Sequence, residues 1–198
     1  MFIETLPLVL FALVATISPG GATTLSTISG LNFGFRRSLP LLAGISLGLG
    51  SMAALAGLGL SSILLELPVL QLAMKVIGAA YLLWLAWQTA RRGQPDLDKD
   101  IAKPTNLVAG IGLLWVNPKA WAMTLGAAAS FAALADSPQK LAALLGVTFT
   151  LFSAVSLALW CAGGILLAKT LKTERQWRIL NVALGLLLAA SVVPILFE

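Results

Sequence analysis

The side chain with the most evident chemistry in this sequence is a lysine in the middle of an apolar stretch long enough to cross a membrane. Lys119 is the single charged residue between Pro104 and Ala135. A lysine near the bilayer centre costs about 3 kcal/mol on insertion scales, so we expect its side chain to face the protein interior. There it could bind an anionic group of a substrate, or take up and release a proton. Alternatively, it could bond carbonyl groups at a helix end and hold the local structure together.

Proline and glycine interrupt two apolar stretches at matching places. Pro19 is followed by Gly20 and Gly21, and Pro118 precedes Lys119, 99 positions further along. Proline removes a backbone donor and frees a carbonyl group one turn earlier, and an adjacent glycine lets the chain unwind. The half-helix starting near Gly21 would then present unpaired N–H groups and a positive dipole end, which suit a carboxylate. Either proline alone could be a structural kink, but two at matching depth indicate one central site.

Uncharged polar and aromatic residues surround both prolines. Their hydroxyl and amide groups could donate and accept hydrogen bonds at a binding site, or the hydroxyl groups could bond carbonyls of their own helices. Trp115 and Trp121 flank the second proline and could form pocket walls or simply pack. The predicted substrate-binding residues are Ser18, Pro19, Gly20, Gly21, Thr23, Thr24, Asn117, Pro118, Lys119 and Trp121.

The composition excludes most other chemistry. The 198 residues include no histidine and one cysteine, Cys161, which excludes an intramolecular disulfide, a thiolate cluster and the usual metal ligands. We therefore predict no catalytic residues, no bound metal and no cofactor. A membrane-embedded enzyme or electron carrier, or a transporter of soft metals, would need thiol or imidazole groups that this sequence does not supply.

The charge content predicts a membrane protein. Charged residues make up 11% of the sequence and hydrophobic residues 59%, whereas soluble domains contain about 25% charged residues. A helix needs about 17 to 25 apolar residues to span a bilayer, and six stretches meet this requirement. We therefore predict an all-α membrane protein with six transmembrane helices. The stretches are Thr5–Phe35, Ser38–Leu65, Leu67–Ala90, Pro104–Ala135, Leu141–Ala168 and Ile179–Phe197.

The basic residues concentrate in three predicted loops. These loops follow the first, third and fifth stretches, at 36–37, 91–103 and 169–178, whereas the opposite loops and termini offer Lys140 beside acidic residues. The positive-inside rule places the three basic loops in the cytoplasm and both termini outside. The net charge of +5 therefore indicates topology rather than nucleic-acid binding.

The offset of 99 positions between the two prolines also relates the other apolar stretches of the chain. Shifting the second and third stretches by the same 99 positions places them on the fifth and sixth. The sequence thus predicts one transmembrane domain made of a first repeat over 1–92, a cytoplasmic loop over 93–104 and a second repeat over 105–198. A unit with an odd number of spans inserts its two copies in opposite orientations. The result is the inverted-repeat architecture of transporters, here with helices 1 and 4 broken.

Four segments carry a resemblance to a known family. They are Ser18-Pro19-Gly20, the turn from Gly34 to Arg37 with the glycine-rich stretch after it, the run from Lys75 to Leu82, and Asn117-Pro118-Lys119-Ala120-Trp121. On these segments the chain resembles, over nearly its whole length, the lysine-exporter superfamily, the LysE/RhtB type of bacterial amino-acid exporters. The resemblance implies six-helix, multi-pass carriers of the bacterial cytoplasmic (inner) membrane, often dimeric. Such carriers export amino acids or related small metabolites with energy from the proton gradient.

Two segments depart from that family pattern. The family often has Pro-Gly-Pro followed by Asn where this chain has Pro19-Gly20-Gly21-Ala22, and it often has an acidic residue where this chain has Gly48-Leu49-Gly50-Ser51. Without that acid, Lys119 is the titratable candidate at mid-depth, and the substrate could differ from the family norm.

We therefore expect a secondary transporter that exports amino acids or related small metabolites by alternating access around the paired helix breaks. The alternatives left open are a lipid scramblase, which needs polar grooves facing lipid, and a non-transporting membrane assembly factor, which needs large partner surfaces. The expected partners are a small-molecule substrate, membrane lipid and a second copy of the chain in a homodimer. No nucleic acid is expected.

Overall fold

The computed structural model describes residues 2–18, 20–59, 68–91 and 105–190. In these ranges the chain forms seven α-helices, one short 3-10 helix at Ala132–Leu134 and no strand, so the predicted all-helical fold is confirmed for the described residues. The helices are α1 (Phe2–Ile17), α2 (Gly21–Gly57), α4 (Pro68–Ala90), α5 (Leu107–Trp115), α6 (Pro118–Ser130), α7 (Pro138–Thr170) and α8 (Glu174–Ala190).

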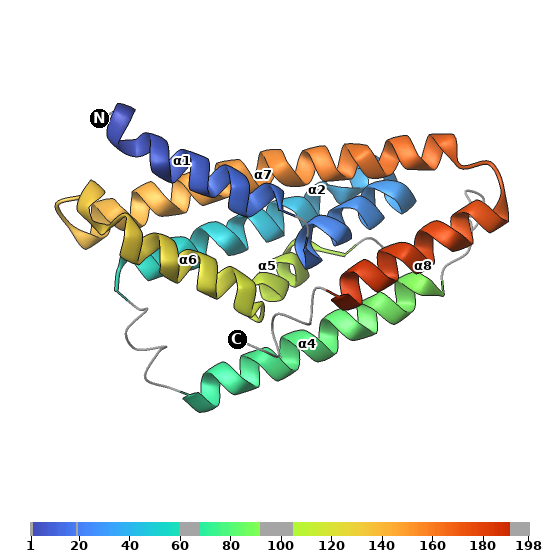
Figure 1. Ribbon diagram of the computed structural model, residues 1–198, viewed down its shortest axis with the longest axis horizontal. Coiled ribbons are helices and arrows are strands. Elements are labelled where there is room, and N and C mark those ends of the chain that lie inside the picture. Colours follow the sequence, from blue (N-terminus) through green and yellow to red (C-terminus); the bar gives the residue numbers. More distant parts are fainter. Residues whose placement is uncertain (1, 19, 60–67, 92–104, 191–198) are drawn as a thin grey trace.

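A glycine divides α2 into two segments that run in opposite directions. Gly34 has φ 73° and ψ 175°, a conformation that a residue with a Cβ atom adopts only under strain. The first segment covers residues 21–33 and the second 35–57, and Figure 1 shows the chain reversing between them. Gly34 is therefore the turn between the first and second predicted stretches.

The first and fourth predicted stretches are each broken beside their proline. The first stretch consists of α1 and the first segment of α2, and residues 18–20 lie between them. The fourth consists of α5 and α6, separated by residues 116–117. The halves are short: α5 has 9 residues and α6 has 13. Among the described helices, α2 and α7 are long and apolar enough to cross a membrane, while residues 5–17 form a shorter apolar helix.

The interior of the bundle is built on close contacts of α2 with α7 and α5 (Figure 1). A Cβ atom at Gly30 of α2 would collide with the carbonyl of Cys161 in α7, and one at Gly164 of α7 with the carbonyl of Thr27 in α2. A Cβ atom at Gly44 of α2 would likewise collide with the carbonyl of Leu107 in α5. Small residues let helix backbones approach closely, which is the main packing device of helices in lipid.

Apolar side chains also cover much of the outer surface. On α7 they form a stripe with a spacing of four residues, each member being 59% exposed: Val147, Leu151, Val155 and Leu159. The α4 and α8 helices lie side by side on one flank of the bundle (Figure 1) and expose further apolar residues, among them Val69, Leu72, Ile179 and Leu186. Apolar surface on this scale fits a lipid environment.

Unlike Lys119, several charged residues lie at the two ends of the bundle. The turn at Gly34, the end of α4 and the connection from α7 to α8 lie at one end (Figure 1), and this end carries basic residues that include Arg36, Arg91 and Lys172. The Arg91 guanidinium lies 4.0 Å from the ring centre of Trp87.

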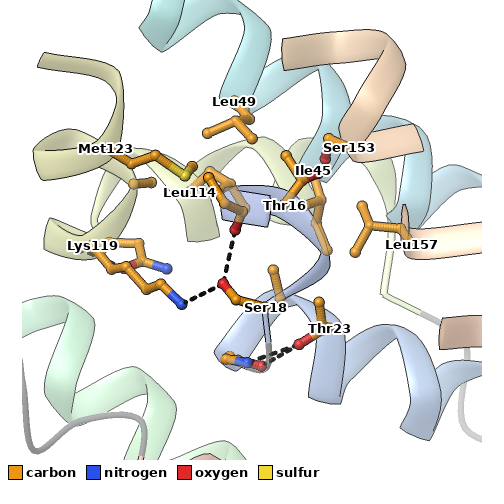
Figure 2. A pocket seen from close by; sticks show the side chains of 16 residues that line it. Thr16, Ser18, Thr23, Ile45, Leu49, Leu114, Lys119, Met123, Ser153 and Leu157 are labelled. Carbon is orange, nitrogen blue, oxygen red and sulfur yellow. Dashed lines mark hydrogen bonds between the residues drawn. The ribbon is translucent and has the colours of Figure 1, made fainter. Parts of the chain in front are cut away.

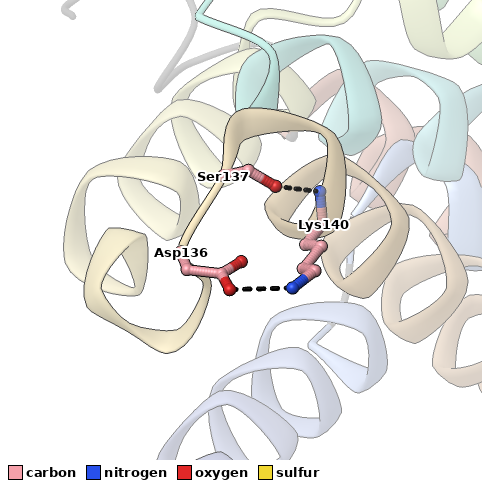
Figure 3. Close-up of polar contacts among 3 residues, drawn as sticks. All are labelled: Asp136, Ser137 and Lys140. Atoms are coloured by element: carbon pink, nitrogen blue, oxygen red, sulfur yellow. Dashed lines mark hydrogen bonds and ion pairs between the residues drawn. The ribbon is translucent and has the colours of Figure 1, made fainter.

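The opposite end of the bundle holds the connection from α6 to α7. There Lys140 Nζ donates to Asp136 Oδ2 at 2.7 Å, and Ser137 caps α7 by accepting a hydrogen bond from the Lys140 backbone N–H at 3.4 Å (Figure 3). This arrangement agrees with the predicted grouping of the basic loops on one side of a membrane.

Candidate functional site

A cavity of about 50 Å³, lined by apolar as well as polar side chains, lies between the two helix breaks. Both breaks contribute to it, and so do the second segment of α2 and the middle of α7. Its lining consists of Ala15, Thr16, Ser18, Gly20, Gly21, Ala22, Thr23, Ile45, Leu49, Leu114, Asn117, Lys119, Ala120, Met123, Ser153 and Leu157. Six residues predicted from the sequence are therefore brought together here: Ser18, Gly20, Gly21, Thr23, Asn117 and Lys119.

The first break leaves the start of α2 without a side-chain cap. Gly20 occupies the N-cap position in an extended conformation, and its N–H donates to Thr23 Oγ1 at 2.8 Å. The first backbone bond of the helix runs from the Thr24 N–H to the Gly20 carbonyl at 2.9 Å. The N–H groups of Gly21 and Ala22 precede that bond and have no acceptor inside the helix. They give this edge of the cavity a positive character.

At the second break, the side chain of Asn117 caps the N-terminus of α6. Asn117 Oδ1 accepts a hydrogen bond from the Lys119 backbone N–H at 3.0 Å, and the Asn117 carbonyl accepts from Ala120 and Trp121. Pro118 occupies the first turn of α6, where the missing N–H costs nothing. Asn117 was predicted as a hydrogen-bonding group near the site, and in the structure its side-chain oxygen caps α6.

Lys119 joins the two breaks. Its Nζ donates to Ser18 Oγ at 3.3 Å, across 101 positions of sequence, while Ser18 Oγ donates to the Ala15 carbonyl at 2.9 Å (Figure 2). Gly20 lies beside it, since a Cβ atom at Gly20 would be 3.3 Å from Nζ. Lys119 lines the cavity and is also exposed, so the ammonium group lies where the cavity meets the surface of the chain. The sequence predicted that the Lys119 side chain faces the protein interior. In the structure it lines the cavity on one side and is exposed on the other.

The two tryptophans predicted as a pocket wall pack against each other. The rings of Trp115 and Trp121 meet edge to face with centres 5.6 Å apart, and Trp121 Nε1 donates to the Trp115 carbonyl at 2.8 Å. Trp115 Nε1 donates to Ser51 Oγ at 3.2 Å. Neither ring belongs to the cavity lining, so the packing alternative describes both better than a pocket wall does.

Three other predicted residues are not placed in the cavity. Thr24 is buried but does not belong to the lining. Pro19 and the side chain of Pro118 lie outside the described residues.

Sequence reasoning missed the contribution of α7. Ser153 and Leu157 line the cavity, and Ser156 Oγ donates to the Thr16 carbonyl at 2.8 Å, close to the end of α1. The serines of this apolar span gave only a weak indication of a role in the site. No local sequence pattern shows that α7 packs beside a helix break more than 130 residues earlier. In the described part of the chain, no three His, Cys, Asp or Glu side chains come together to hold a metal ion.

Broken helices that meet at a cavity with a few polar groups, inside an apolar helical bundle, define a class of protein, the membrane transporters. The comparison with known proteins leads to a family within that class. The profile of the LysE type translocators matches residues 11–195, and the chain belongs to this family. It is therefore a multi-pass membrane transporter of a small molecule and not an enzyme.

Several curated relatives match over almost their full length. Proteins named cysteine/O-acetylserine efflux protein from Salmonella paratyphi A and from Escherichia coli K12 are each 30% identical over 190 residues, covering 94% of this chain and 94% of the relative. The protein of the same name from Salmonella typhimurium is 30% identical over 191 residues, with the same coverage of both chains. No solved structure gives a significant match.

Proposed function

We propose that this transporter exports a small zwitterionic amino acid, or a closely related metabolite, through the cavity between the two helix breaks. The observation that carries the proposal is the contact of 3.3 Å between Lys119 Nζ and Ser18 Oγ, because it joins the breaks of the two halves at one polar point. The names of the relatives, which refer to efflux of cysteine and O-acetylserine, support a small amino acid as the substrate.

The charges around the cavity suit both ends of an amino acid. A carboxylate would bind the N–H groups at the start of α2 together with the Lys119 ammonium, taking the place of the contact with Ser18. The amino group would bind near the end of α1, where residues 15 and 16 line the cavity and the helix dipole is negative. Half-helices that oppose their ends in this way are a recurrent means of binding zwitterions in the membrane.

Transport requires that the site open first to one side of the membrane and then to the other. We propose alternating access between two inverted three-helix repeats, residues 1–92 and 105–198, which together give six membrane spans. The basic end of the bundle then faces the cytoplasm and both termini face outward.

Exchange in proteoliposomes tests this function. Vesicles loaded with a mixture of amino acids and organic acids are incubated with isotope-labelled counterparts, and mass spectrometry identifies the solutes that exchange. We expect selective exchange of small amino acids by the wild-type protein. Lys119→Met should lower it about 10- to 100-fold, because a hydrogen bond to a charged group is lost.

The matched control is Lys140→Met. Lys140 lies at an exposed end of the bundle, paired with Asp136, so its removal should leave exchange unchanged. Absence of exchange for every solute would contradict the proposal and favour a scramblase or an assembly factor. Dithionite quenching of labelled lipid in the same vesicles separates those two alternatives.

A further inference from the structure

The hydroxyl group of Ser153 is the unusual polar group of the cavity. Ser153 is 3% exposed, lines the cavity, and has no hydrogen-bond partner among the described residues. Two nearby buried serines do have partners: Ser26 Oγ donates to the Leu157 carbonyl at 2.6 Å, and Ser156 Oγ to the Thr16 carbonyl at 2.8 Å. The Ser153 hydroxyl can therefore donate a hydrogen bond to, and accept one from, a molecule that enters the cavity.

A serine or threonine within a helix can donate its hydroxyl hydrogen to a carbonyl of the preceding turn, but Ser153 does not make this bond. Thr150, almost one turn earlier on α7, donates to the Gly146 carbonyl of its own helix at 2.7 Å. Ser46 does the same on α2, donating to the Leu42 carbonyl at 2.9 Å. The Ser153 hydroxyl makes no such bond and remains at the cavity wall, where an incoming ligand can reach it.

The position of Ser153 relative to Lys119 suggests which part of a ligand it meets. Figure 2 shows Lys119 and Ser153 on opposite sides of the cavity, with Ser18 and Thr16 between them. Figure 2 shows Thr16 as well as the apolar Ile45 and Leu157 on the side of the cavity where Ser153 lies, and the Thr16 hydroxyl donates to the Ala12 carbonyl at 2.7 Å. An amino acid whose carboxylate binds at Lys119 and the start of α2 would therefore direct its side chain toward a largely apolar wall, where the Ser153 hydroxyl makes no bond within its own helix.

We propose that Ser153 determines specificity by hydrogen bonding to the substrate side chain. It would favour a short side chain with one hydroxyl, thiol or ester group over an alkyl side chain of the same size. This inference rests on the proposed function, because it assumes that the cavity binds an amino acid. A site that supplies a hydrogen bond to one substrate discriminates against the analogue that leaves its polar group unpaired.

Paired substrates provide the test. Exchange of serine is compared with that of alanine, and exchange of cysteine with that of 2-aminobutyrate, in vesicles containing wild-type protein, Ser153→Ala or Ser153→Thr. We expect Ser153→Ala to lower the serine-to-alanine ratio about tenfold by reducing serine exchange, the size of effect that one lost hydrogen bond produces. Ser153→Thr keeps the hydroxyl and should keep most of the preference. Thr150→Ala is the control, because Thr150 bonds within its own helix and does not line the cavity.

Thiol labelling provides a measurement that does not depend on transport. The chain has one cysteine, and Cys161 is fully buried, so the wild-type protein should resist a small methanethiosulfonate reagent. Ser153→Cys should react with it, and serine should protect that thiol better than alanine does. Absence of labelling in Ser153→Cys would contradict access to this wall.

The two proposals fail in different ways. No exchange of any amino acid by the wild-type protein would contradict the proposed function itself. Exchange of serine with an unchanged ratio in Ser153→Ala would contradict the role of Ser153 alone.

Discussion

The two helix breaks both line the cavity, yet the helices that follow them are capped differently. At the first, the N-cap residue is Gly20, which has no side chain to cap the helix, and Gly20, Gly21 and Ala22 line the cavity. At the second, Asn117 Oδ1 caps α6 at 3.0 Å. We therefore expect a ligand to bind at the first break, whereas the N-terminus of α6 at the second break is capped by Asn117.

The helices that follow the breaks also differ in how they are held. The first segment of α2 is fixed against α7 by backbone contacts at Gly30 and Gly164 and by the hydrogen bond from Ser26 Oγ. In α6, Thr124 and Ala127 are fully buried, while Gly126 lies on the exposed side of the helix, where an added Cβ atom would have no neighbour within 4 Å. The helix after the first break is therefore held by backbone-to-backbone contacts, and the helix after the second break by buried side chains.

The largest expected effect concerns this anchoring. Gly164→Ala should destabilise the protein by about 3 kcal/mol or prevent folding, because its Cβ would collide with the Thr27 carbonyl. Gly163→Ala is a closely matched control, since a Cβ there meets nothing within 4 Å. Thermal unfolding in detergent measures both. Equal stability of the two variants would contradict a tight contact between α2 and α7.

An intermediate effect is expected at the first break. Gly20→Ala keeps an extended conformation that any residue adopts, but its Cβ would be 3.3 Å from Lys119 Nζ and would displace the ammonium group from Ser18. We expect a fold that is retained and a loss of exchange of about tenfold, because one charge-assisted contact is weakened. Gly112→Ala in α5, where a Cβ has free space, should leave exchange unchanged. Normal exchange by Gly20→Ala would show that this contact is not needed.

The smallest effect is expected at the second break. Asn117→Ala removes the N-cap of α6 and should cost about 1 kcal/mol, whereas Asn117→Asp retains a capping oxygen and should keep the stability. Unfolding midpoints of the two variants give the comparison. If Asn117→Asp lost as much stability as Asn117→Ala, the amide would have another role than capping.

Local signals explain which parts of this structure could be predicted. A charge in an apolar stretch and a proline beside glycine are visible in the sequence, so Lys119 and both breaks were found. Ser153 lines the cavity because α7 packs against a segment far away in sequence, and no local sequence pattern predicts that packing. Trp121 was assigned to the pocket because of its neighbours in sequence, but the direction of its ring is set by packing on Trp115. The final residues of the second predicted stretch, 60–65, lie outside the described residues.

The turn at Gly34 has a consequence for the order in which the chain is made. The first segment of α2, with its buried Ser26, Thr27 and Ser29, is complete as soon as the ribosome passes this turn. The partner of Ser26 is the carbonyl of Leu157, which follows 131 residues later. At usual rates of synthesis this is a delay on the order of ten seconds. Thr27 and Ser29 find their hydrogen-bond partners at Thr23 and Ser38, close by in sequence, so during translation the Ser26 hydroxyl alone among these three waits for α7.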